Sequence, residues 1–116
     1  MRGWIFGAGL LMLACAPVAA ADAPDAAKIW KDKCASCHSA TGKGDTKMGS
    51  KMKVADMTAA EWQKKHDDAA IKKAVAEGVT REEDGIKKKM KAYKDFKPEE
   101  VQALIDFIRA LAPKAP

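Results

Sequence analysis

The chain has 116 residues, 32% of them charged, and this length allows one small domain. Its formal net charge is +5, but no helix-turn-helix pattern and no platform of interleaved basic and aromatic residues accompanies that charge, which excludes a nucleic-acid-binding role. The sequence also has no Ser-His-Asp or paired-carboxylate arrangement, so we expect no enzymatic activity.

The first 21 residues have the features of an export signal. Met1-Arg2 supplies a positively charged start, residues 3–21 carry no charge, and Ala19-Ala20-Ala21 provides the small residues of a cleavage site. We therefore predict a signal peptide over residues 1–21, a mature domain over residues 22–116 and a periplasmic location.

Two alternatives for this leader stay open. The segment Leu11-Met12-Leu13-Ala14-Cys15 resembles a lipobox, in which Cys15 would be lipidated and become the mature amino terminus. The uncharged stretch is also at the lower limit of the length that spans a membrane, so the leader can remain as an anchor. We expect attachment to a membrane only in these two cases.

The first helix of the mature domain is predicted to begin after Asp25, a good N-cap residue, and to end near Cys37. Its apolar residues recur at spacings of three and four and therefore share one face. These residues are Ala26, Ile29, Trp30 and Cys34.

The last turn of this helix carries Cys34-Ala35-Ser36-Cys37-His38, the pattern of covalent haem attachment. Two thiols three positions apart can each add to a vinyl group on one edge of a porphyrin, and the histidine that follows can bind the iron. We therefore predict one haem c, bound covalently through Cys34 and Cys37, with His38 as an iron ligand.

Other chemistries also use a C-x-x-C pair. A zinc site needs four ligands, and only Cys15 and His66 remain as further cysteine and histidine residues. A thioredoxin-like redox pair needs a βαβ context, and no alternating pattern of β-branched residues lies nearby. A plain disulfide in an exported chain stays open.

The middle of the chain is predicted to form a loop and two short helices. Residues 39–56 contain three glycines and many lysines without a regular period, which indicates a loop. The segment Thr58–Glu61 matches a capping box that opens a helix. Asp67 or Asp68 caps the next helix, which is predicted to end at Gly78.

Residues 79–97 are highly charged and irregular, and we expect no regular element there. The final helix has the clearest pattern, because Pro98 suits its first position and Pro113 ends it. Its apolar stripe consists of Val101, Leu104, Ile105, Ile108 and Leu111.

From Ala26 to Leu111 the chain resembles a monohaem class I cytochrome c. It shares with that family an amino-terminal helix with Trp30 four residues before the first cysteine, the Cys34–His38 motif, short helices, a methionine and a carboxy-terminal amphipathic helix. The resemblance implies an all-α fold in which three to five helices surround one covalently attached haem. It also implies that the first and last helices cross where Ala26 meets Phe107.

In this family a methionine sulfur binds the iron opposite the histidine. Met90-Lys91-Ala92-Tyr93 resembles the family's Met-Pro-Ala-Phe sequence and lies shortly before Pro98, so the resemblance implies that His38 and Met90 are the iron ligands. It also implies that the carbonyl of Ser50 accepts a hydrogen bond from the other ring nitrogen of His38. His66 and three further methionines stay open as the second ligand; the methionines are Met48, Met52 and Met57.

The resemblance implies an electron-transfer protein that shuttles single electrons between periplasmic or membrane redox partners. Lysines crowd around Met90, where Asp95 is the one carboxylate, and we expect this positive surface to attract an acidic partner. Lysines that only keep a small protein soluble are the alternative. The lysines are Lys87, Lys88, Lys89, Lys91, Lys94 and Lys97.

Two other functions stay open. In a haem enzyme or gas sensor, Met90 would be displaced and a small molecule would bind the iron in its place. In a lipid-anchored subunit of a redox complex, Cys15 would fix the cytochrome to the membrane beside one partner.

Overall fold

The computed structural model describes residues 24–113 and three separate glycines, Gly3, Gly7 and Gly9. The predicted cleavage site and Cys15 lie outside the described residues, so the export signal and its alternatives stay predictions. Among the described residues, no helix is long and apolar enough to cross a membrane.

The amino-terminal helix is continuous through the haem motif, as predicted. Its start is capped by Asp25, whose Oδ1 accepts the backbone N–H of Lys28 at 3.1 Å. Three parts follow one another along it: α1 (Ala26–Ile29), η2 (Trp30–Cys34) and α2 (Ala35–His38).

The middle part, η2, is a turn of π-helix that the sequence did not predict. In it the N–H of Ala35 reaches back five residues to the carbonyl of Trp30. A π turn inserts one extra residue into the helical register, and such turns are frequent at functional sites. Here the π turn ends at Cys34, the first residue of the haem motif.

The predicted loop over residues 39–56 contains a short helix, α3 (Lys47–Lys51), so that prediction was wrong in part. Thr46 caps α3, because its hydroxyl oxygen accepts the N–H of Gly49 at 2.9 Å. The same hydroxyl donates to the carbonyl of Ser36 at 2.7 Å. The cap therefore ties α3 to the haem motif.

Helix α4 (Ala60–Lys65) is the short helix predicted in this region, but the predicted capping box is wrong. Its N-cap is Ala59, which has no polar side chain. Thr58 donates both its backbone N–H and its hydroxyl to the carboxylate of Asp56. The hydroxyl is occupied by that carboxylate, and the helix starts one residue later.

Helix α5 (Asp68–Glu77) begins and ends as predicted. Asp67 is the N-cap and accepts the N–H of Ala70 at 2.7 Å. At the other end Gly78 has a φ of +74°, and a Cβ on it would lie 2.6 Å from the carbonyl oxygen of Met90. Glycine therefore allows the main chain at Met90 to pack against the end of α5.

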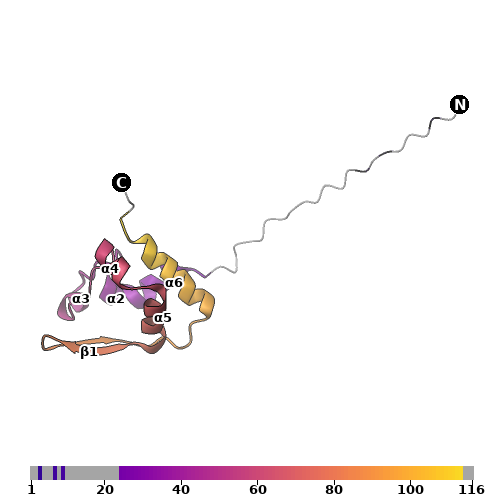
Figure 1. The fold of residues 1–116 in the computed structure, drawn as a ribbon. Coiled ribbons are helices and arrows are strands. Elements are labelled where there is room, and N and C mark those ends of the chain that lie inside the picture. Colours follow the sequence, from indigo (N-terminus) through magenta and orange to yellow (C-terminus); the bar gives the residue numbers. More distant parts are fainter. Residues whose placement is uncertain (1–2, 4–6, 8, 10–23, 114–116) are drawn as a thin grey trace.

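Two antiparallel strands occupy a region for which no regular element was predicted, so that prediction was wrong. They are β1 (Val79–Glu83) and β2 (Ile86–Met90), and Val79 pairs with Met90. The turn residues Asp84 and Gly85 have φ values of +53° and +75°, which is the pattern of a type I′ hairpin turn. In Figure 1 the hairpin extends along one side of the helices, with α5 at its base.

Helix α6 (Pro98–Ala110) confirms the predicted last helix and packs against α1 and α5. Its apolar stripe is the centre of the core, because four of its side chains are buried. The buried apolar residues of the described chain are Trp30, Ile71, Val75, Val101, Leu104, Ile105 and Ile108. Each such side chain contributes about 1.5–3 kcal/mol through the removal of its surface from water.

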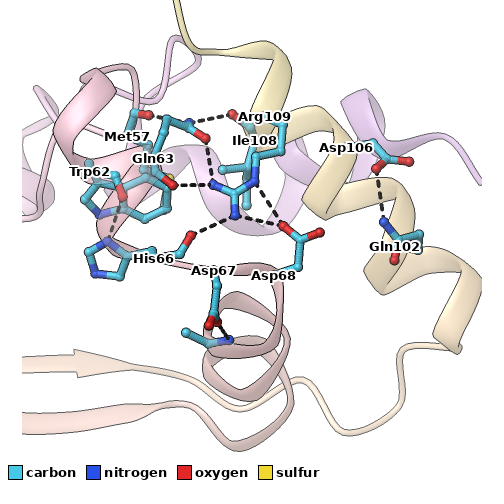
Figure 2. Close-up of polar contacts among 11 residues, drawn as sticks. Met57, Trp62, Gln63, His66, Asp67, Asp68, Gln102, Asp106, Ile108 and Arg109 are labelled. Carbon is cyan, nitrogen blue, oxygen red and sulfur yellow. Dashed lines mark hydrogen bonds and ion pairs between the residues drawn. The ribbon is translucent and has the colours of Figure 1, made fainter.

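Arg109 on α6 fastens the corner between α4 and α5 (Figure 2). Its guanidinium donates to the carbonyl of His66 at 2.7 Å and to the side-chain and backbone oxygens of Gln63 at 2.8 and 3.0 Å. It also pairs with Asp68 at 2.8 Å. Gln63 in turn donates to the carbonyl of Met57 at 2.7 Å, so the network also holds the chain before α4.

The described chain is thus mostly helical, with five helices when the continuous amino-terminal segment is counted once. This confirms the expected helical fold, to which the structure adds the small hairpin. The first and last helices are in contact, as the resemblance implied, and the aromatic partner of Phe107 is Trp30, with ring centroids 5.2 Å apart.

Candidate haem site

The haem motif occupies the end of the amino-terminal helix, with Cys34 in η2 and Cys37 and His38 in α2. All three side chains are half-buried, and both cysteines are free thiols. Two thiols one helical turn apart, with an imidazole beside them, are the groups that attach and ligate a haem.

The thiols do not have the character of a redox pair. Burial raises the pKa of Cys34 to about 11, against the opposing effect of the Lys33 ammonium, and Cys37 raises it further. Thioredoxin-like cysteines have lowered pKa values, because the thiolate is their reactive form. The neutral thiol at Cys34 therefore argues against the thioredoxin-like alternative.

Burial of His38 favours its neutral imidazole. Burial lowers its pKa, and the neutral form is the one that binds metals. The indole of Trp30 lies against it, with ring centroids 5.7 Å apart, and is itself fixed by a hydrogen bond from Nε1 to the carbonyl of Ser39 at 2.9 Å. This indole restricts the orientations that the imidazole can take.

Nδ1 of His38 is buried and has no hydrogen-bond partner in the described part of the chain. The implied bond to Ser50 is thus not observed, and the Ser50 carbonyl instead accepts the N–H of Lys53 at 3.3 Å. An unpaired buried nitrogen is costly. Nδ1 is the nitrogen that would orient the ring, so an iron would bind the other nitrogen, Nε2.

The loop after the motif folds back onto it. The N–H of Gly44 donates to the carbonyl of His38 at 2.9 Å. Gly49 lies so close to the carbonyls of Cys37 and Gly44 that a Cβ would collide with both. Glycine at this position therefore lets α3 pack directly on the haem motif.

Met90 is half-buried and packs against the hydrophobic core at the end of β2. Three residues later, Tyr93 donates its N–H to the carbonyl of Val75 at 2.8 Å and its hydroxyl to the carbonyl of Lys33 at 3.0 Å. Burial raises the pKa of Tyr93, and the two nearby thiols raise it further. Because Lys33 directly precedes Cys34, the segment from Met90 to Tyr93 lies beside the haem motif.

Met57 is a second half-buried methionine that packs against the same core. Its N–H donates to the carbonyl of Gly42 at 2.9 Å, and Gly42 belongs to the loop that also binds the carbonyl of His38 through Gly44. The main chain at Met57 is therefore attached to the loop on the His38 side of the motif.

The remaining alternative ligands lie in other surroundings. His66 sits at the corner between α4 and α5, where its ring stacks on Trp62 at 4.5 Å and Nδ1 lies 3.0 Å from the Trp62 carbonyl (Figure 2). Met48 is 49% exposed on α3. Met52 follows the same helix and is half-buried.

Comparison with known proteins identifies the family. The family model described as cytochrome c matches residues 23–112. The chain belongs to the cytochrome c family. A solved structure described as the KustC0563 c-type cytochrome is similar to this cytochrome c with a TM-score of 0.64 and 29% sequence identity, over 77% of this chain and 99% of that chain. No curated protein matches the sequence significantly.

Haem c, bound covalently through Cys34 and Cys37, is the cofactor of this cytochrome c. The residues present fit it, because both thiols are free, His38 follows them directly, and burial favours the neutral, metal-binding form of its imidazole. The family match supports a histidine and a methionine as the ligand pair. Met57 and Met90 are the half-buried methionines that pack against the hydrophobic core of the described residues. Between these two, Met90 as the second ligand stays a prediction.

Two contacts at the site were not predicted. Trp30 was placed on the apolar face of the first helix, but its contact with the His38 ring was not expected. The bond from Tyr93 to Lys33 joins residues that are 60 positions apart. Periodicity within one element cannot reveal a pair at that separation.

Proposed function

We propose that this cytochrome c is an exported carrier of single electrons in which His38 and Met90 are the two iron ligands. The observation that carries the proposal is the hydrogen bond from Tyr93 to Lys33, because it attaches the Met90 segment to the helix that bears the haem motif. When bound, the haem iron supplies the one-electron chemistry.

The residues of the chain have separate tasks in this proposal. Cys34 and Cys37 fix the porphyrin edge, and His38 offers a neutral nitrogen whose orientation Trp30 restricts. The thioether of Met90 is soft and uncharged, so it favours Fe(II) and raises the reduction potential relative to a second histidine. As a ligand, Met90 would also exclude water or a small molecule from the iron, which favours a carrier over a haem enzyme or sensor.

Met90 is preferred to Met57 because a second ligand would have to come from a part of the chain separate from the one that holds His38. The Met57 main chain is bonded to the loop that binds the His38 carbonyl, which supports a position on the histidine side. The Met90 main chain packs on Gly78 at the end of α5 and continues to Tyr93. Met57 is the second candidate, because it is also half-buried and packs against the same core.

The absorption spectrum of the ferric holoprotein tests this choice. A bond between methionine sulfur and ferric iron gives a weak charge-transfer band at the red end of the visible spectrum. We expect Met90→Ala to lose that band, whereas Met57→Ala and His66→Ala keep it. Loss of the band in Met57→Ala with retention in Met90→Ala would assign the ligand to Met57.

We also propose that an acidic redox partner docks on the lysines around Met90. Lys33, Lys91 and Lys94 line a surface pocket beside the stacked rings of Tyr93 and Phe96. Among the lysines considered, Lys88 is engaged within the protein, since it pairs with Glu83 at 3.1 Å and donates to a backbone carbonyl. The exposed lysines proposed for docking are Lys87, Lys89, Lys91, Lys94 and Lys97.

Cytochromes of this family work outside the cytoplasm, which supports export through the leader. The mass of the mature amino terminus distinguishes the proposed forms. A start at Asp22 supports a free periplasmic carrier, and a lipidated Cys15 supports a membrane-attached cytochrome subunit.

A further inference from the structure

We propose that Tyr93 is a positioning residue for the second iron ligand, acting through the hydrogen bond between its hydroxyl and the carbonyl of Lys33. This inference rests on the proposed ligation by Met90. The bond connects the helix that carries the haem motif with the segment that carries Met90.

The two ends of this bond occupy significant positions in the chain. Lys33 belongs to the π turn η2 and directly precedes Cys34, so its carbonyl moves with the haem attachment. Tyr93 follows Met90 by three residues, which leaves only a short length of chain between the hydroxyl anchor and the methionine. The 3.0 Å bond therefore limits how far the Met90 segment can move from the motif.

Tyr93 makes three further contacts besides the bond from its hydroxyl. Its N–H donates to the carbonyl of Val75 at 2.8 Å. Its ring stacks on Phe96, with centroids 5.1 Å apart and planes within 8° of parallel, and the ammonium of Lys91 lies 5.9 Å from the ring centroid. The main-chain bond ties the segment to α5, and the hydroxyl ties it to η2.

The hairpin provides the second restraint on the same segment. At Met90 the strand β2 is paired with Val79, and two residues earlier Lys88 donates to the carbonyl of Lys53 at 3.2 Å. The chain just before Met90 is therefore restrained by strand pairing. The chain just after Met90 is restrained by the Tyr93 hydroxyl, which bonds it to the helix of the haem motif.

Removal of this hydroxyl should make displacement of the methionine easier. One neutral hydrogen bond changes an equilibrium constant by about three- to tenfold. Here the two states are the protein with Met90 bound to the iron and the protein with Met90 released from it. Any external ligand that competes for the iron should bind more tightly by the same factor. Imidazole is a suitable probe because it binds ferric haem at the position that the methionine leaves.

The test compares the affinity of ferric full-length holoprotein for imidazole in the wild type, Tyr93→Phe and Gln102→Ala. Tyr93→Phe keeps the ring and removes only the hydroxyl. Gln102→Ala is the matched control, because it removes one exposed side-chain hydrogen bond, to Asp106, on the outer side of α6 (Figure 2). We expect a three- to tenfold tighter imidazole affinity in Tyr93→Phe, with the charge-transfer band retained, and no change in the control.

A second variant, Phe96→Leu, removes the stacked ring and keeps the hydroxyl. We expect less than a twofold change in imidazole affinity for it, which separates the hydrogen bond from general packing. Equal imidazole affinity in wild type and Tyr93→Phe would overturn the positioning role. The spectrum of Met90→Ala tests ligation by Met90 independently, so failure of the positioning role and failure of the ligand assignment are distinguishable.

Discussion

Trp30 lies against His38 with ring centroids 5.7 Å apart and planes tilted by 39°. The indole is only 3% exposed and donates Nε1–H to the carbonyl of Ser39, the residue that follows the motif. The Trp30 side chain thus restricts the orientation of His38 and also holds the chain at Ser39. It also contacts Phe107, so the last helix is linked to the same site.

Trp30→Phe should therefore destabilise the holoprotein. The substitution removes one of two donors to the Ser39 carbonyl, which also accepts the N–H of Gly42 at 3.2 Å, and we expect a loss of about 0.5–1.5 kcal/mol in the free energy of unfolding. Denaturant unfolding followed at the haem absorption measures it. Trp62→Phe is the matched control, since Trp62 is half-buried and its indole N–H makes no hydrogen bond within the described residues. An equal loss in both variants would contradict the role of the Ser39 bond.

The chain without haem should be largely unfolded. A small domain with seven buried apolar side chains in its described residues has a modest core, and a covalently attached porphyrin would supply much of the missing apolar surface. Cys34→Ala combined with Cys37→Ala removes both attachment points. We expect a product without covalent haem and with low helical circular dichroism. Cooperative unfolding of that haem-free variant would show that the chain folds without its cofactor.

Arg109→Met should loosen the corner between α4 and α5. The guanidinium donates to the carbonyls of Gln63 and His66, and hydrogen bonds from a charged donor contribute about 1.5–3 kcal/mol. Thermal or denaturant unfolding measures the change. Asp68→Asn is the control for the ion pair alone, because Asp68 is 61% exposed and an exposed pair contributes less than about 1 kcal/mol. A larger loss in the control than in Arg109→Met would refute this ranking.

Charge reversal at Lys89 and Lys91 should weaken the salt dependence of electron transfer to an acidic partner. Both side chains are exposed, and attraction between opposite charges is screened as ionic strength rises. We expect a flatter plot of the logarithm of the bimolecular rate constant against ionic strength for K89E/K91E. Lys28→Glu, an exposed change on α1, provides the comparison. An unchanged slope in the double variant would remove these lysines from the docking surface.

Local signals account for what the sequence predicted correctly. Asp25, Asp67 and Pro98 act within one turn of the chain, and all three begin helices as expected. The residues of the haem motif are contiguous from Cys34 to His38, so the sequence alone also predicted this site. Competing local bonds explain one error, because the Asp56 carboxylate binds Thr58 and prevents the expected cap.

The hairpin was missed although Asp84-Gly85 is a strong turn signal. Strand β1 is charged and mostly exposed, and in β2 the half-buried residues Ile86, Lys88 and Met90 alternate with exposed ones, but the lysine at the central half-buried position hides this alternation in the sequence. The Thr46 cap was missed because glycines and lysines around it indicated a loop. The bond from Tyr93 to Lys33 depends on the assembled fold, and no single segment predicts it.

Exposure of the reduced holoprotein to carbon monoxide, followed by its visible absorption spectrum, tests the central claim most directly. A six-coordinate carrier whose iron is closed by His38 and a methionine should be low-spin and should keep its spectrum under carbon monoxide. A high-spin spectrum with rapid carbon monoxide binding would contradict the claim and would indicate a haem enzyme or gas sensor with an open iron position.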